Sequence, residues 1–218
     1  MTVKPIARAA TACSVMGVES TLERAATVPA LPATPAWNRA LRDPRWALGS
    51  TLAVARARYD LRRCDLVGRR TRLYGRCLVR NWGRIEIGGR VLIYGHTVRS
   101  ELNAHAGGLL RIGDGAFLNY GCAVSAHTEV WIGEGALIGQ YSLIMDCDYH
   151  GQEGGGAHGR PAAIAIGPHS WLGARVIVLK GMTIGACAIV GAGSVVTRDV
   201  PPRTLAGGSP ARVIRQLD

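Results

Sequence analysis

The chain has 218 residues, a formal net charge of +11 and 48% hydrophobic residues, but only 6% aromatic residues and a single Phe. This length allows one domain with a sizeable core. The basic excess favours anionic partners, yet the Lys and Arg residues form no consecutive block and are not interleaved with aromatics, which argues against nucleic-acid binding. No apolar run approaches the roughly 18 residues of a membrane span.

The cysteines give no sign of a metal site or a disulfide framework. The six residues show no C-x-x-C pair and no tight cluster, so we expect buried thiols in a reducing compartment. The first twenty residues look like an export signal, but their apolar part is short and Glu19 and Glu23 follow closely. We therefore expect a cytoplasmic protein.

The first 63 residues lie outside the pattern that fills the rest of the chain. Residues 1–36 are rich in Ala, Thr and Pro, which is typical of a mobile leader. A helix is predicted from Asp43, because an Asp precedes Pro44 and arginines follow towards its end. We expect this helix to cover the open first layer of the following repeat. Membrane-surface association of the Arg-rich segment is an alternative that we do not favour.

From about residue 64 onwards, large aliphatic residues recur every six positions. A period of six does not fit a helix, whereas it suits one short strand plus one corner with one inward aliphatic side chain. Three such sides close a triangular coil, and the coils stack by parallel pairing. The all-β fold predicted for residues 64–203 is a parallel β-helix, followed by a tail at 204–218. Its inward rows are Ile112, Leu118 and Val124; Ile132, Ile138 and Ile144; and Ile166, Leu172, Val178, Ile184, Val190 and Val196.

The stretch "IMDCDYHG" interrupts these rows with two acids, a thiol, a tyrosine and a histidine. The next inward aliphatic after Ile144 is Ile166, 22 positions later. We interpret this spacing as one full coil of 18 residues plus four extra, so that the segment 145–165 bulges out as a loop. Loops on a rigid scaffold are where catalytic groups concentrate.

Two motifs carry a resemblance to a known family. "HSWLGARVIVLKGMTIGACAIVGAGSVVTRDVPP" and "LAGGSPARVIRQL" resemble the closing coils and tail of the hexapeptide-repeat acyltransferases, which fold as a left-handed parallel β-helix. The Asp-x-Asp-aromatic-His cluster is most similar to that of the sugar and polysaccharide O-acetyltransferases in this family. "GGSPARVI" departs mildly from the common Gly-Asn-Pro-Ala ending.

The resemblance implies roles for residues around the cluster. His150 would be the general base, since histidine gains and loses a proton near neutral pH and a sugar hydroxyl attacks a thioester only as its proton is removed. Asp148 or Asp146 would orient the imidazole, with Asp148 preferred. Asn119 matches an asparagine that helps to hold the acceptor and the developing oxyanion. His127 falls where some relatives carry a substrate-contacting aspartate.

The resemblance also implies acetyl-CoA as the acyl donor, with no metal ion. Trp171 would lie near the acyl end of the cofactor, and the small residues Ala174 and Ala192 would let the pantetheine arm approach the backbone. Phosphate contacts are expected from arginines, which can form two parallel hydrogen bonds with a phosphate. The matching arginines are Arg198, Arg212 and Arg215.

Together these features predict an enzyme that acetylates a sugar hydroxyl of a glycan or glycoconjugate. The family works as homotrimers with the site between neighbouring prisms, so we expect a trimer that takes a carbohydrate or small-molecule acceptor. N-acetylation of an amino sugar or an antibiotic-like amine is one alternative. A zinc enzyme resembling the β-helical carbonic anhydrases and a non-catalytic assembly module are the others, although the histidines show no matching zinc-ligand spacing.

Overall fold

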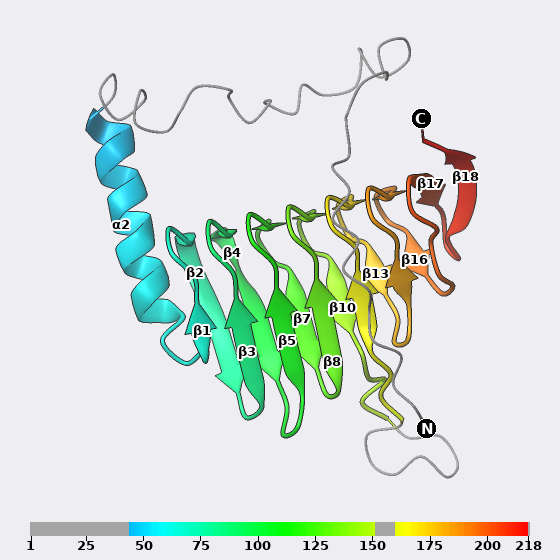
Figure 1. Cartoon of the computed structure of the whole chain (residues 1–218), viewed down its shortest axis with the longest axis horizontal. Helices are drawn as coiled ribbons and strands as arrows, with labels where there is room; N and C mark the ends of the chain where they lie inside the picture. Colours follow the sequence, from blue (N-terminus) through cyan, green and yellow to red (C-terminus); the bar gives the residue numbers. More distant parts are fainter. Residues whose placement is uncertain (1–43, 151–159, 218) are drawn as a thin grey trace. The chain divides into compact units, whose positions relative to one another are not determined.

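The computed structural model describes residues 44–150 and 160–217, with side chains from Leu48 onwards (Figure 1). The leader at 1–36 and the glycine-rich part of the loop predicted at 145–165 lie outside the described residues. The predicted helix is present as α2 (Pro44–Asp60). Ala53 and Ala57 are buried against the first coil, and Arg56 donates a hydrogen bond to the backbone oxygen of Gly75, at 3.0 Å, which lies on the strand that α2 contacts.

The strands that follow wind into a β-helix with three faces, whose successive coils pair in parallel. The first face consists of β1 (Leu66–Val67), β3 (Arg84–Ile87), β5 (Leu109–Ile112), β8 (Glu129–Ile132), β11 (Ile164–Ile166) and β14 (Thr183–Ile184). The second face consists of β6 (Phe117–Leu118), β9 (Leu137–Ile138), β12 (Trp171–Leu172), β15 (Ile189–Val190) and β17 (Thr204–Gly207). The third face consists of β7 (Ala123–Ala126), β10 (Leu143–Met145), β13 (Ile177–Val178) and β16 (Val195–Val196).

Two long strands join the second and third faces at the start of the solenoid. β4 (Leu92–Ala104) pairs with β6 through its first residues and with β7 through its last four. β2 (Arg72–Asn81) runs beside β4 across the same corner. The two backbones approach so closely there that a Cβ on Gly95 would lie 1.9 Å from the backbone oxygen of Arg76. Glycine is therefore required at that turn.

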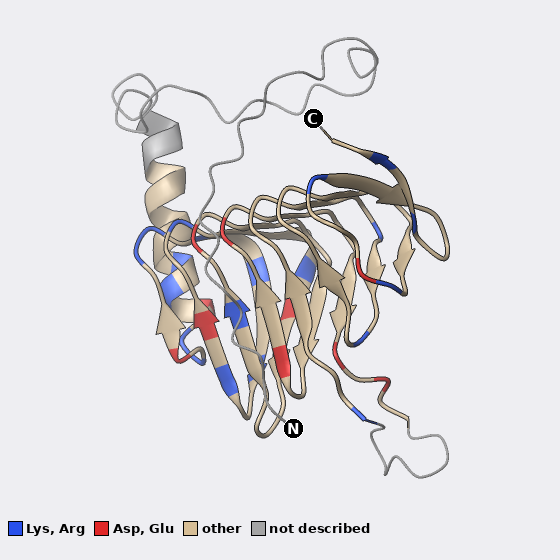
Figure 2. Ribbon diagram, turned by 45° about the vertical axis from the view of Figure 1, so that its right-hand side comes forward, with Lys and Arg blue, Asp and Glu red and all other residues tan. Residues whose placement is uncertain are grey.

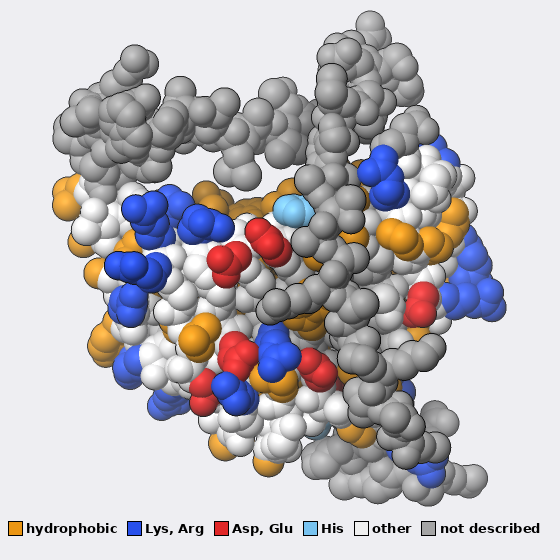
Figure 3. Space-filling view, viewed as in Figure 1, with side chains coloured by type: hydrophobic (Ala, Val, Ile, Leu, Met, Phe, Trp, Pro, Cys, Tyr) orange, Lys and Arg blue, Asp and Glu red, His pale blue; other side chains and the backbone are white. Residues whose placement is uncertain are grey.

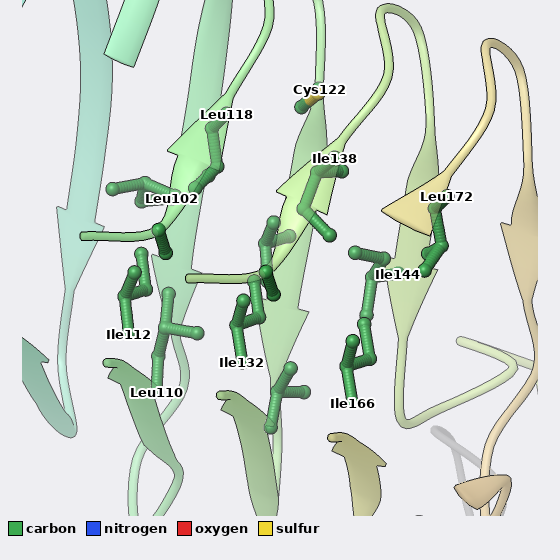
Figure 4. Close-up of a cluster of buried hydrophobic side chains, with 14 of the residues drawn as sticks. Leu102, Leu110, Ile112, Leu118, Cys122, Ile132, Ile138, Ile144, Ile166 and Leu172 are labelled. Carbon is green, nitrogen blue, oxygen red and sulfur yellow. The ribbon is translucent and has the colours of Figure 1, made fainter. Parts of the chain in front are cut away.

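The inward rows predicted from the six-residue period are confirmed. On the first face Ile132 pairs with Ile112 and Ile166, and on the third face Ile144 pairs with Val124 and Val178. Figure 4 shows such side chains from all three faces meeting along the axis. Each buried aliphatic side chain contributes roughly 1.5–3 kcal/mol, so these rows supply the main stabilisation of the coils. All the predicted row members are at most 2% exposed.

The predicted length of the insertion after Ile144 was wrong. Ile166 pairs directly with Ile132 on the first face, so the step from Ile144 to Ile166 turns a single corner and not a full coil. A regular step takes six residues and this one takes 22, which leaves an insertion of sixteen. The chain therefore inserts a much larger segment beside Asp146 than the spacing first indicated.

The residues predicted as a tail form strands. β17 extends the second face by pairing with β15, and β18 (Arg212–Gln216) folds back antiparallel to β17. The last coil therefore ends in a strand pair that covers its edge. Within the part of the chain that the structure describes, no helix is long and apolar enough to cross a membrane.

Candidate active site

His150 lies at the corner that leads from the third face towards the first. β10 ends at Met145, and the residues after it leave the coil. The His150 side chain is exposed, while Tyr149 before it adopts a left-handed backbone conformation with φ of 60°. The histidine thus stands on the surface beside a sharp turn.

Asp146 has a buried carboxylate that forms hydrogen bonds with the backbone of the preceding coil. Its two oxygens accept backbone N–H groups of His127 at 2.7 Å, Thr128 at 2.7 Å and Glu129 at 3.0 Å. The His127 Nδ1 lies 3.6 Å from Asp146 Oδ1. Since Asp146 is fully buried, these bonds compensate its lost hydration.

Asp148 is exposed and forms an ion pair with Lys180 of the next coil. Within the described residues, the contacts of Asp146 and Asp148 thus go to the backbone at 127–129 and to Lys180, and none joins either carboxylate to His150. The expectation that one of them orients the imidazole stays a prediction.

Tyr149, the residue before His150, is anchored by Ser125, His105 and His127, of which only His127 was singled out from the sequence. The Tyr149 hydroxyl lies 2.5 Å from Ser125 Oγ and 3.4 Å from His105 Nε2. The rings of His105 and His127 stack with centroids 3.7 Å apart, and Tyr149 packs edge-on against both. The strand pairing places Trp82, His105 and His127 at equivalent corner positions of successive coils. That recurrence was the signal available in the sequence.

A second edge, between the second and third faces, carries Asn119 and the residues predicted to contact the acyl and pantetheine parts of the cofactor. Asn119 follows β6, and its Nδ2 donates to Gln140 Oε1 at 3.3 Å. Trp171 pairs with Leu137 and Ile189 on the second face and is 42% exposed. Ala174 and Ala192 follow β12 and β15 at equivalent positions, one coil apart. The structure brings these four residues to one edge.

The two edges lie on opposite sides of the third face. Asn119 comes before β7 on this face, whereas His150 comes after β10. A four-residue strand such as β7 spans roughly 13 Å. The structure therefore separates Asn119 and His150 within one chain.

The three predicted phosphate-binding arginines are exposed and do not converge. Arg198 follows β16 on the third face, so it stands on the same edge as Lys180 and His150. Arg212 and Arg215 lie on β18, beside the second face. Each of these two donates to a nearby backbone oxygen, Arg212 to Ala211 at 2.9 Å and Arg215 to Gln216 at 3.2 Å.

No group of three or more His, Cys, Asp or Glu side chains that could hold a metal ion occurs among the described residues. The histidines of the corner stack, His105 and His127, contact Tyr149, Trp82, Asp146 and each other. The zinc site considered from the sequence takes three histidines across a subunit interface, so the contacts within one chain leave it a prediction.

Comparison with known proteins points to acetyltransferases, although no family model matches the chain. It is 39% identical over 106 residues to a Schizosaccharomyces pombe protein with the provisional name of an acetyltransferase, covering 47% of this chain and 50% of that one. It is 32% identical to the galactoside O-acetyltransferase of Escherichia coli over 117 residues, 51% of this chain and 56% of that one. The chain thus spans about half the length of these curated relatives.

Solved structures match over more of the chain. A hexapeptide-repeat acetyltransferase from Vibrio cholerae, complexed with acetyl coenzyme A, superposes with a TM-score of 0.54 at 26% identity and covers 86% of this chain and 92% of that one. An N-acyltransferase from Bacillus cereus has a TM-score of 0.62 at 19% identity over 73% of this chain and 88% of that one, a likeness of fold alone. The chain has the left-handed parallel β-helix of the hexapeptide-repeat acetyltransferases, and its curated relatives carry acetyltransferase names.

Proposed function

We propose that the protein transfers the acetyl group of acetyl-CoA to a sugar hydroxyl in a site shared by two chains of a homotrimer. The observation that carries this proposal is the placement of Asn119, Trp171 and Ala174 on one edge of the prism and of His150 on another. A general base has to lie within about 3–3.5 Å of the attacking hydroxyl, and an oxyanion donor within about 3 Å of the oxygen of the carbonyl that is attacked. If Asn119 and His150 serve one reaction, they therefore come from different chains, as a closed head-to-tail ring allows.

His150 is the general base in this proposal. Its exposed imidazole accepts the proton of the acceptor hydroxyl as the oxygen attacks the thioester carbonyl. The new C–O bond forms, the C–S bond breaks as the tetrahedral intermediate collapses, and the imidazolium returns the proton to the leaving thiolate of coenzyme A. The contacts of Tyr149 with Ser125 and His105 hold the turn from which His150 projects.

Asn119 stabilises the oxyanion that develops on the carbonyl. A side-chain amide has two N–H groups, and one of those of Asn119 donates to Gln140. The second is available to a ligand at the half-buried edge. Removing one such donor costs about 10²–10³ in kcat in well-studied oxyanion holes.

The same edge provides a path for the cofactor. Ala174 and Ala192 have small side chains at equivalent corner positions, and Trp171 presents an exposed ring on β12, the strand that Ala174 follows. Acetyl-CoA is present in the complex of the Vibrio cholerae relative, which supports acetyl-CoA as the donor here. Arg198, Arg212 and Arg215 are the proposed contacts of the nucleotide phosphates.

The first test compares His150→Ala with the wild type, using acetyl-CoA and a panel of sugar hydroxyl and amino-sugar acceptors. Loss of a positioned general base should lower kcat by about 10²–10⁴ while the oligomer persists in light scattering. His169→Asn is the control, because His169 is an exposed corner histidine with φ of 55° and Asn tolerates that conformation. Near-normal turnover in His150→Ala would overturn the mechanism, and transfer to amines alone would assign N-acetylation.

The second test asks whether the two edges come from different chains. Asn119→Ala and His150→Ala are each prepared as inactive proteins and then co-expressed. A site built from two chains recovers both residues in about a quarter of the sites of randomly mixed trimers. A site built within one chain recovers none, so the absence of any recovered activity would contradict the shared site.

A further inference from the structure

An open groove of about 900 Å³ lies between α2 and the strands β2 and β4. Its volume is near the upper end of the roughly 300–1,000 Å³ typical of small-molecule sites. We propose that it binds a negatively charged oligosaccharide segment, as the extended subsite for an acidic glycan acceptor. This inference rests on the proposed acetyl transfer and adds to it the chemical class of the acceptor.

The ionisable residues that line the groove are mostly basic. Among the described residues that line it, one carboxylate, Asp60, stands against five arginines and one histidine. Figure 2 shows basic residues on α2 and the turns beside it, and Figure 3 shows Lys and Arg side chains gathered at the end that holds β1 and β2. A cleft lined by charges of one sign concentrates ligands of the opposite sign. The basic lining residues are Arg56, Arg62, Arg63, Arg76, Arg99 and His96.

The arginines divide into those used by the fold and those available to a ligand. Arg56 donates to Gly75, and the Arg62 guanidinium donates to the Tyr59 backbone oxygen and lies 4.3 Å from the Tyr59 ring centroid. Arg76 and Arg99 are exposed, and among the described residues neither has a carboxylate partner. An exposed guanidinium can bind a carboxylate or sulfate through two parallel hydrogen bonds.

The walls between these arginines also suit sugar rings. Leu52 and Tyr59 of α2 line the groove and are 59% and 67% exposed. On the opposite wall, Tyr74 packs edge-on against Tyr94 and tilted against His96, which holds its ring in place. Apolar and aromatic side chains interleaved with fixed cations can contact the apolar faces of sugar rings while the cations bind their acidic substituents.

The groove leads to the edge that carries Asn119. Arg99 lines the groove, and the next residue, Ser100, is buried and donates to the backbone oxygen of Asn119 at 3.0 Å. Gly121 also donates its N–H to the backbone oxygen of Val98, at 3.0 Å. An oligosaccharide in the groove would therefore extend towards Asn119, where the acceptor hydroxyl is proposed to react. This continuity favours a glycan over a nucleic acid or a membrane surface, because the proposed reaction acetylates a sugar hydroxyl of a glycan or glycoconjugate.

The test measures binding to the full chain without acetyl-CoA, using calorimetry with oligogalacturonate and with a neutral malto-oligosaccharide of equal length. Arg76→Ala/Arg99→Ala should weaken oligogalacturonate binding by about tenfold or more, since two charge-assisted contacts are lost. The matched control is Arg58→Ala/Arg69→Ala, which removes the same charge from exposed residues that do not line the groove. The control should change the affinity less than twofold, because substitutions of exposed residues outside a binding site usually have small effects.

Three binding results would overturn the inference: equal affinity for the neutral oligomer, equal losses in both double variants, or tighter Arg76- and Arg99-dependent binding of an RNA homopolymer or of phosphatidylserine vesicles. Acceptor assays separate this inference from the proposed function. Arg-dependent binding of oligogalacturonate without acetyl transfer to any acceptor would support the groove and contradict acetyl transfer. Acetylation with no preference for acidic over neutral glycans would support acetyl transfer and contradict the groove.

Discussion

Replacing Asp146 by Asn should destabilise the fold. Asp146 is fully buried, and its carboxylate accepts three backbone N–H groups from residues 127–129. Asn has one acceptor oxygen in place of two, so it can at best keep the two bonds made to Oδ2, from Thr128 and Glu129. The N–H of His127 would then face an amide N–H₂.

The magnitude follows from these bonds. Hydrogen bonds to charged groups contribute roughly 1.5–3 kcal/mol, neutral ones about 1, and a buried donor left without a partner costs roughly 1–3. Two bonds weakened by about 0.5–2 kcal/mol each and one stranded donor should together lower the free energy of unfolding by about 2–7 kcal/mol. With a slope of about 2 kcal/mol/M, the urea midpoint would fall by about 1 M or more.

The assay is equilibrium unfolding in urea, followed by circular dichroism at one fixed protein concentration, because an oligomer's stability depends on concentration. Asp148→Asn is the control: Asp148 is half exposed and its ion pair with Lys180 is a surface pair, worth about 0–1 kcal/mol. Turnover of both variants is measured at low urea. If Asp146→Asn unfolds like the wild type yet loses turnover, its carboxylate acts on His150 and its role in fastening the coil is refuted.

Three further predictions concern the core, the cofactor and the thiols. Val178→Asp should abolish folding, because Val178 lies between Ile144 and Val196 at 1% exposure and an unpaired buried charge costs several kcal/mol. The exposed Leu179→Asp should fold, and a soluble, folded Val178→Asp protein would contradict the register. Arg198→Ala and Arg215→Ala should raise KM for acetyl-CoA and weaken its salt dependence with kcat largely kept; unchanged KM in both would remove them from the cofactor site. Burial, aided by the Asp65 carboxylate, raises the pKa of the Cys64 thiol to about 12, and burial raises that of Cys122 to about 12. The unfolded thiols ionise near pH 8.5, so the free energy of unfolding should fall as the pH rises from about 8.5 towards 12. For the same reason neither cysteine should be alkylated in folded protein at pH 8. Rapid alkylation of either thiol, read by mass spectrometry, would contradict this.

The rows of inward aliphatic residues were predictable because the geometry of a β-helix coil restricts which residues can point towards the axis. Each side of a coil has room for one large inward side chain, so Leu118, Ile138 and Leu172 repeat at that position and align in the structure. The insertion after Ile144 was not predictable in the same way. A spacing of 22 fits either a full coil with a short excess or one corner with a long one. Only the pairing of Ile166 with Ile132 separates the two cases.

The separate environments of the two carboxylates follow from their positions relative to the strand β10. In a strand, residues two apart face the same side, so Asp146 continues the inward side of Ile144 whereas Asp148 follows after the chain has left the coil. A carboxylate on the inward side has to find backbone donors, and it finds them at residues 127–129. The resemblance to a catalytic cluster instead predicted an Asp–His pair. Among the described residues of the single chain, neither carboxylate contacts His150.

Asn119 and His150 lie on different edges of the prism, which the sequence motifs did not predict. Sequence similarity assigned Asn119 and His150 to one reaction, but motif spacing carries no information about which edge of a prism a residue occupies. The pairing of β7 with β10 puts the width of the third face between them. If His150 is the base and Asn119 the oxyanion donor of one reaction, as proposed, both must contact the same small group of atoms, which their positions within one chain do not allow. A rotation that carries the His150 edge of one chain to the Asn119 edge of the next satisfies this requirement, and repeating it closes a ring.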